Sequence, residues 1–418
     1  MQTKQAGFTE VAGGTITTPK GFTAAGLHCG LKQAGRPDLG AIVCEVPAAA
    51  AAVYTQNAFQ AAPLHVTRDS LASGGKLQAL LVNSGNANAC IGRQGLADAY
   101  EMRSAMAEAL GVPAALVGVA STGIIGELLP MEKVRGGIAR MPRQLSADGC
   151  DFSQAILTTD LVQKSVCVRL EIAGKTVHIA GTAKGSGMIH PNMATMLGFI
   201  TTDARIGSGQ LQSLLGQTTD STFNMITVDG DTSTNDMVVV LASGLAGHDP
   251  LHPGHSDWSV FAEAFCYVAQ YLAKAIARDG EGAAKLIGVN VRGALSNRSA
   301  GIIAKTVVGS SLVKTACYGA DANWGRIIAA VGRWGRIIAA VGRSGEPVAA
   351  DFVDIHIGEI PVLIKSAPVE VDEEKATLYL KGEEVAIYID LHQGAGSATA
   401  WGCDLTYDYV RINASYRT

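Results

Sequence analysis

The sequence predicts an α/β protein in which mixed sheets and helices form layers. Short apolar runs of strand length alternate along the chain with longer segments whose apolar residues recur at helical spacing. With 418 residues the chain can form one large or two medium domains around an ample core. Its 49 glycines indicate numerous turns and tight backbone packing. Elements of both kinds must bury an apolar face, and a layered arrangement allows this.

Composition excludes several classes of protein. The formal net charge is -4, so we expect no nucleic-acid partner. The eight cysteines are dispersed without a Cys-x-x-Cys pair, as in a protein kept reduced in the cytosol. The N-terminus lacks an apolar signal region, and no run approaches the roughly 18 apolar residues of a membrane span. We therefore expect a cytoplasmic protein without a membrane partner.

The first 150 residues predict strands and helices in alternation. Apolar runs bounded by glycine or proline predict strands, and apolar residues at spacings of three and four predict helices. We expect strands over residues 40–46, 77–82 and 116–120, and helices over 95–111 and 131–141. Gly111 and Pro113 should end the first helix.

The rest of the chain continues the alternation. Two alternating stretches, 166–171 and 176–180, flank Ala173-Gly174-Lys175 and predict a hairpin that leads the chain to Lys184. Further helices are expected over 208–215, 256–278 and 300–316, and further strands over 196–200, 237–241, 352–356, 376–380 and 385–391.

The junction between Ala194 and Thr195 is the position with the most specific chemistry. Glycines and Pro191 make residues 184–194 a turn-rich loop, and an apolar run follows directly. A threonine hydroxyl at such a junction can attack the preceding carbonyl, move the acyl group to oxygen and let water cleave the ester. The new α-amine, with a reference pKa of about 7.7 to 8.0, can then act as general base to the same hydroxyl. The alternative is an ordinary core strand entered through a glycine loop, and the residues alone favour it.

Three further positions carry candidate groups. A turn at Ser121-Thr122-Gly123 exposes amide groups that can hold an oxyanion, although it can equally be a plain strand-to-helix turn. Lys184 is the only cation close in sequence to the junction, and the alternative is a solvated lysine. Glu281 lies on a turn after the helix over 256–278, where its carboxylate can hold the α-amine of an amino acid. Three histidines between 248 and 255 lack matching ligands, so no metal is expected.

Lys184 to Leu197 resembles the self-processing site of the glutamate N-acetyltransferase family, also called ornithine acetyltransferases, whose members cut themselves between Ala and Thr. The resemblance covers essentially the whole chain. Its other motifs, in the family's order, are Gly21-Phe22, Asn83 to Cys90, Ser121 to Gly126, Thr158-Thr159-Asp160, Asp229 to Asp236, Asp279 to Gly282 and Asn413 to Thr418.

The resemblance implies an N-terminal-nucleophile-like fold and a ping-pong acetyl transfer from N2-acetylornithine to glutamate. It implies cleavage between Ala194 and Thr195 into chains 1–194 and 195–418 that fold together, with two copies of the pair forming a heterotetramer. It also implies no cofactor, with acetyl-CoA as a further donor in some members. The implied site residues are the nucleophile Thr195, the oxyanion donors Thr122 and Gly123, and the substrate-binding residues Thr158, Lys184, Thr195, Glu281, Asn413 and Thr418.

Two other functions compete with this interpretation. A self-cleaving amidohydrolase or aminopeptidase would use the same nucleophile but would not need glutamate. An uncleaved binding or structural protein would keep Thr195 as a core residue. One feature departs from the family: residues 324–333 are repeated at once, residue for residue, as 334–343. Because ten helical residues advance about 15 Å, we expect one copy to loop out on the surface.

Overall fold

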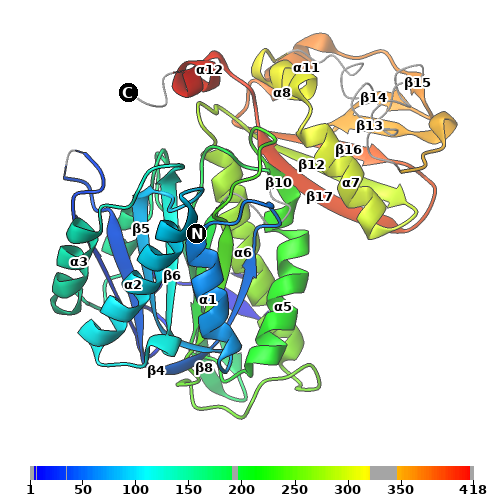
Figure 1. The fold of residues 1–418 in the computed structure, drawn as a ribbon. Coiled ribbons are helices and arrows are strands. Elements are labelled where there is room, and N and C mark those ends of the chain that lie inside the picture. The colour runs from blue at the N-terminus through cyan, green and yellow to red at the C-terminus, as the bar shows by residue number, and fades with distance from the viewer. Residues whose placement is uncertain (1–3, 6, 34, 191–195, 321–345, 415–418) are drawn as a thin grey trace. The chain divides into compact units, whose positions relative to one another are not determined.

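The structure, a computed structural model, describes residues 4–5, 7–33, 35–190, 196–320 and 346–414. The chain divides into two compact units (Figure 1). The first contains the described residues within 1–185, 191–220 and 231–272, and the second those within 186–190, 221–230 and 273–418.

The first unit is built on a large mixed sheet. Among the described residues it has ten strands in the order β1-β2-β7-β8-β9-β11-β4-β5-β6, with β3 paired to β4. Strand β9 pairs antiparallel with β8 and parallel with β11. The bounds are β1 Lys4–Gln5, β2 Phe8–Glu10, β3 Phe22–Leu27, β4 Leu39–Tyr54, β5 Lys76–Asn86, β6 Val117–Ile124, β7 Lys164–Ile172, β8 Lys175–Lys184, β9 Leu197–Thr202 and β11 Met237–Ala242.

Both faces of this sheet are buried. Alternate residues of a strand point to opposite faces, and Ile42 and Leu80 accordingly join one apolar cluster with Phe152, whereas Ala41 joins another with Met102. The helices of this unit are α1 Ala62–Ala72, α2 Gly92–Leu110, α3 Met131–Arg140, α4 Cys150–Ala155 and α5 Ser208–Ser221. A sheet covered on both faces explains the largely apolar strands and confirms the layered α/β class.

The second unit has its own sheet. Its described strands follow the order β10-β17-β12-β16-β13-β14-β15, in which β12 runs parallel to β16 and antiparallel to β17. The strands are β10 Ile226–Thr227, β12 Leu286–Ala294, β13 Asp354–Ile357, β14 Ile360–Ile364, β15 Ala367–Pro368, β16 Glu384–Asp390 and β17 Gly396–Cys403. The helices are α7 Asn297–Val308, which packs on β12 and β17, α8 Ser311–Tyr318, α11 Glu373–Leu380 and α12 Tyr407–Ala414.

Helix α6, Trp258–Arg278, is the long helix expected over 256–278. By length and composition it could cross a membrane. Its apolar stripe, however, is completely buried within the protein, as in the core helix of a soluble protein. The stripe consists of Phe261, Phe265, Val268, Leu272 and Ile276.

Local signals located the central elements correctly. Helix α2 ends at Gly111, which adopts the left-handed conformation typical of a C-cap. Strands β7 and β8 form the expected hairpin, and Ala173 and Gly174 at its tip have φ angles of 49° and 71°. The last residue of β8 is Lys184. The hairpin therefore carries the chain to the expected position.

Three expectations were wrong. Residues 376–380 belong to helix α11 and not to a strand, because the Asp372 carboxylate accepts a hydrogen bond from the Lys375 amide (3.0 Å) and caps the helix start. The helix expected over 300–316 is two helices, α7 and α8, separated at Gly309. Strand β6 does not end at residue 120 but continues through Ser121, Thr122 and Gly123 to Ile124, so these residues form a strand end.

Several predictions fall outside the described residues. These are the junction Ala194-Thr195, the C-terminal Thr418 and the duplicated segment 324–343. The looping-out of one repeat stays a prediction.

Candidate active site

The candidate oxyanion residues lie at the paired ends of β5 and β6. In this parallel pair Thr122 lies opposite Ser84, and Gly123 opposite Gly85. Gly123 has a φ of 136°, and a Cβ atom there would lie 2.3 Å from the Gly85 carbonyl carbon and 2.5 Å from the Asn86 nitrogen. Only glycine fits such a conformation and such a close approach. The backbone at Gly123 is therefore held tightly.

Lys184 reaches the same strand end from β8. Its ammonium group donates a hydrogen bond to the Thr122 hydroxyl oxygen at 3.3 Å. The residue is only 7% exposed, so the alternative of a solvated lysine is wrong. Because the hydroxyl oxygen accepts from lysine, the hydroxyl proton of Thr122 is left to point at another acceptor. The structure thus brings Thr122, Gly123 and Lys184 together.

A buried carboxylate, Asp160, holds this lysine in place. Its oxygens lie 2.7 Å from the Lys164 ammonium nitrogen and 3.9 Å from that of Lys184. They also accept hydrogen bonds from the amides of Thr158 (3.0 Å) and Gly185 (2.6 Å). Burial alone would raise the pKa of Asp160, but the two ammonium groups and these hydrogen bonds hold it well below its ordinary value. Asp160 therefore stays ionised and orders the Thr158-Thr159-Asp160 motif.

A second lysine near Lys184 was not anticipated from the sequence. The Lys32 ammonium group donates hydrogen bonds to the carbonyl oxygens of Pro37 (2.9 Å) and Leu157 (2.6 Å). Burial lowers the pKa of Lys32 to about 8, with Asp38 opposing the shift and Lys184 adding to it. Lys32 thus fixes the backbone that leads into the Thr158 turn. No sequence signal could identify the contact with Leu157, because 125 residues separate it from Lys32.

In the second unit Glu281 and Asn413 form a pair. The Asn413 amide nitrogen donates to a Glu281 carboxylate oxygen at 2.9 Å. Glu281 is 6% exposed, and its carboxyl group packs so closely on Gly187 that a Cβ atom there would lie 2.3 Å from the carboxyl carbon. The backbone of Glu281 also donates to the Ser186 carbonyl at 3.1 Å. The predicted turn after α6 is confirmed, and it presents a buried carboxylate.

The segment Ser186 to His190, which precedes the candidate junction, is fastened within the second unit. The amides of Met188 and Ile189 donate to the two carboxylate oxygens of Asp229, at 2.6 and 2.9 Å. His190 is half-buried, and its Nδ1 atom lies 2.9 Å from the Thr227 hydroxyl. One carboxylate thus orders two consecutive amides of the loop.

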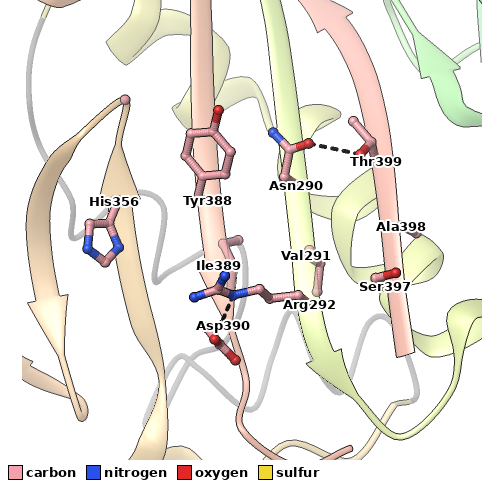
Figure 2. Close-up of a pocket in the computed structure, with 11 residues that line it drawn as sticks. Asn290, Val291, Arg292, His356, Tyr388, Ile389, Asp390, Ser397, Ala398 and Thr399 are labelled. Atoms are coloured by element: carbon pink, nitrogen blue, oxygen red, sulfur yellow. Dashed lines mark hydrogen bonds and ion pairs between the residues drawn. The ribbon is translucent and has the colours of Figure 1, made fainter. Parts of the chain in front are cut away.

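A separate hollow of about 420 Å³ lies on the sheet of the second unit. Figure 2 shows Arg292 of β12 reaching Asp390 of β16, 2.7 Å away, and Asn290 beside Thr399 of β17, at 2.8 Å. None of the predicted site residues that the structure describes lines it. The polar contacts join neighbouring strands, so they are explained by sheet structure.

Comparisons with known proteins agree on one family. A family model described as the ArgJ family matches residues 23–333 and 332–418, two segments that meet inside the duplicated stretch. The arginine biosynthesis bifunctional protein ArgJ of Geobacillus kaustophilus is 60% identical over 418 residues, covering 100% of this chain and 99% of that protein. Its Bacillus cereus counterpart is 55% identical over 419 residues and covers all of both chains. A crystal structure of the Bacillus halodurans protein of that name is 57% identical and covers 53% of this chain and 100% of its own, with a TM-score of 0.50.

Replacing Asp160 tests the buried charge network. We expect D160N to destabilise the protein by about 3 kcal/mol at pH 7, because two buried lysines lose their counter-ion. Since the folded-state pKa of Asp160 is depressed, its stabilisation is complete above the unfolded value near 4 and declines as the pH falls below it. The midpoint of thermal denaturation, measured for both proteins at pH 7 and pH 3, should therefore differ most at pH 7.

The matched control is D249N, because Asp249 is exposed. It should leave the denaturation midpoint unchanged at both pH values. A D160N deficit of the same size at pH 3 and pH 7 would contradict an ionised, paired Asp160.

Proposed function

Because the chain belongs to the ArgJ family, we propose that it is a glutamate N-acetyltransferase of arginine biosynthesis, which moves an acetyl group from N2-acetylornithine to L-glutamate. The observation that carries this proposal is the similarity over the full length to curated ArgJ proteins, at 55 to 60% identity. The buried contact between Lys184 and Thr122 supplies a matching arrangement of groups.

The nucleophile would arise by self-cleavage between Ala194 and Thr195. The Thr195 hydroxyl attacks the Ala194 carbonyl, the peptide nitrogen becomes a free amine, and water cleaves the ester. Chains 1–194 and 195–418 would remain folded together, because β9 pairs with β8 and β11 pairs with β4, and each of these pairs joins one strand of each chain. The solved Bacillus halodurans chain matches 53% of this chain with its entire length, and residues 195–418 make up a similar share.

The transfer would then proceed in two halves. The Thr195 hydroxyl attacks the acetyl carbonyl carbon of N2-acetylornithine, while the α-amine of the same residue takes the hydroxyl proton. The carbon–nitrogen bond breaks, ornithine leaves with that proton on its amine, and the acetyl group stays on Thr195 as an ester. The amine of glutamate attacks this ester, and the bond between the acetyl carbon and the Thr195 oxygen breaks. N-acetylglutamate leaves, and a proton from the glutamate amine restores the Thr195 hydroxyl.

Thr122 and Gly123 would stabilise the negative charge that develops on the acetyl oxygen. Their donors would be the Thr122 hydroxyl and the Gly123 amide. The Lys184 ammonium donates a hydrogen bond to the hydroxyl oxygen of Thr122. The hydroxyl proton of Thr122 would then point towards the oxyanion. Donors that are fixed before the reaction cost no reorganisation in the transition state.

The amino-acid parts of the substrates would be bound by Thr158, Lys184, Thr195, Glu281, Asn413 and Thr418. A carboxylate such as Glu281 suits the cationic amine of ornithine or glutamate, whereas the Lys184 ammonium suits a carboxylate group. Asn413 keeps the Glu281 carboxylate oriented through a hydrogen bond of 2.9 Å. Glutamate must reach the ester before water, so binding and exclusion of solvent decide the outcome.

The proposed enzyme is further defined by its cofactor, its second acetyl donor and its assembly. The enzyme needs no cofactor or metal, and the bifunctional name of its relatives supports acetyl-CoA as a second acetyl donor, in an amino-acid N-acetyltransferase reaction. Two copies of the cleaved pair form a heterotetramer in the cytoplasm. Neither nucleic acid nor a membrane takes part.

Cleavage and acceptor use can be measured on the same protein. Intact mass under denaturing conditions should show two chains, 1–194 and 195–418, and N2-acetylornithine with glutamate should yield ornithine and N-acetylglutamate. T195A should remain a single chain and lose all transfer, because hydroxyl and amine both come from Thr195. The control T176A, which alters a threonine of the β7–β8 hairpin paired with Glu171, should behave as the wild type.

The products decide between the proposal and its competitors. Acetate released at the same rate with and without glutamate would instead indicate an amidohydrolase or aminopeptidase. A single intact wild-type chain would indicate a binding or structural protein.

The close approach of Gly123 to the Gly85 backbone can be tested by adding a methyl group at Gly123. G123A should lower the rate of acetyl transfer by about 100-fold, because a misplacement near 1 Å costs about that much and a Cβ atom there meets the Gly85 backbone at 2.3 Å. The control is G136A in α3, where a Cβ atom would meet nothing within 4 Å. It should keep full activity. Equal rates for the two variants would contradict the role of Gly123.

A further inference from the structure

The motif Asp229 to Asp236 ends in three buried residues that have no role in the proposed reaction, and the last two of them make the contacts that matter here. Asn235 and Asp236 are 5% and 4% exposed and directly precede β11. Strand β11 is an inner strand of the first sheet, paired with β4 on one side and β9 on the other. The two residues therefore lie directly before an inner strand, next to the start of β9.

The Asn235 side chain holds the strand end that carries the candidate oxyanion donors. Its amide nitrogen donates to the carbonyl oxygens of Ser121 (2.9 Å) and Ala87 (2.5 Å). Its amide oxygen accepts from the Thr234 hydroxyl at 2.6 Å, which fixes the orientation of the group. Ser121 is joined directly to Thr122. Asn235 thus fixes the position of the strand end that carries Thr122 and Gly123.

Asp236 holds the other side. Its carboxyl group accepts a hydrogen bond from the Met196 amide, and the next residue, Met237, donates from its own amide to the Met196 carbonyl at 3.1 Å. Met196 is therefore hydrogen-bonded at both its amide and its carbonyl. The amide nitrogen of Met196 belongs to the peptide bond with Thr195. The Asp236 backbone carbonyl is fixed in turn by the Thr55 amide at 2.9 Å.

We propose that Asn235 and Asp236 form a positioning clamp, which holds the Thr122-Gly123 strand end through Ser121 and the start of the β9 segment through Met196, the residue that follows the nucleophile in the sequence. This inference rests on the proposed function. Two adjacent residues directly before the inner strand β11 hold both parts, so one peptide unit links the oxyanion strand end to the residue that follows the nucleophile. Such a device would serve self-cleavage and acetyl transfer alike, since both need Thr195 and an oxyanion in register.

The chemical state of Asp236 determines which variant is the closest match. Burial raises the pKa of the Asp236 carboxyl group well above its ordinary value, and the Lys184 ammonium together with hydrogen bonds from the Met196 amide and the Ser233 hydroxyl offsets this only in part. Its Oδ2 atom is buried without a hydrogen-bond partner among the residues that the structure describes. A carboxamide has nearly the same shape as a carboxyl group, so asparagine can keep an oxygen that accepts from Met196.

The experiment follows self-cleavage of the full chain after cell-free synthesis, with denaturing gels to time the two products. D236A, which removes the acceptor of the Met196 amide, should slow cleavage by about 100-fold, and D236N should recover most of that loss. N235D should slow cleavage similarly, because a carboxylate cannot donate to the Ser121 and Ala87 carbonyls. In the cleaved fraction of D236A, kcat for acetyl transfer should fall while KM for N2-acetylornithine stays close to the wild-type value.

The matched control is D203A at the far end of β9. Asp203 is fully buried and accepts hydrogen bonds from the amides of His178 (2.8 Å) and Lys20 (3.2 Å). D203A thus removes a comparable buried acceptor of backbone amides on the same sheet. The folded fraction of this variant should cleave at the wild-type rate. Circular dichroism confirms folding, and D236N keeps the test informative if D236A fails to fold, because a clamp requires D236N to cleave faster than N235D.

The results separate the clamp from the proposed function. Equal cleavage by D236A and the wild type, or an equal loss in D203A and D236A, would overturn the clamp. A wild type that cleaves itself but does not acetylate glutamate would overturn the proposed function alone, and the cleavage rates would still decide the clamp. A wild type that never cleaves would overturn the clamp as a device for Thr195.

Discussion

The ion cluster around Asp160 is the interaction on which the first unit's candidate site depends. A carboxylate whose side chain is completely buried lies 2.7 Å from one ammonium group and 3.9 Å from another. Two buried lysines without this counter-ion would each carry a large desolvation cost. The same carboxylate accepts from the Thr158 and Gly185 amides, so it fixes both the Thr158 turn and the residue that follows Lys184. The position of Lys184, and through it of the Thr122 hydroxyl, follows from this cluster.

Carboxylates that accept backbone amides recur throughout the protein. Asp38 accepts from four consecutive amides, Cys29 to Lys32, and its pKa is low because these hydrogen bonds outweigh the effect of burial. Asp229 holds the loop before the junction, and Asp404 holds the amides of Ala284 and Lys285 after the Glu281 turn. Charged residues make up only 17% of the sequence, and many of these carboxylates order loops. Fixed loops allow small groups to be placed accurately for catalysis.

The Lys184 ammonium acts on the carboxyl groups of both Asp160 and Asp236, but the pKa values of these two groups shift in opposite directions. The ammonium groups of Lys184 and Lys164, together with two amides, hold the pKa of Asp160 below its ordinary value, whereas burial raises the pKa of Asp236. Carboxyl groups driven to different pKa values in one region are typical of active sites.

The sequence by itself determined the features that depend on residues close together in the chain. The β7–β8 hairpin formed at Ala173-Gly174, α2 ended at Gly111, and the motif from Lys184 to Leu197 pointed to one family and one reaction. Only the tertiary structure decided that Lys32 and Asn235 hold the candidate site, and that 373–380 is a helix. The physical reason is that hydrogen-bond partners and desolvation come from strands brought together by sheet pairing over long sequence distances, and no local pattern records that pairing.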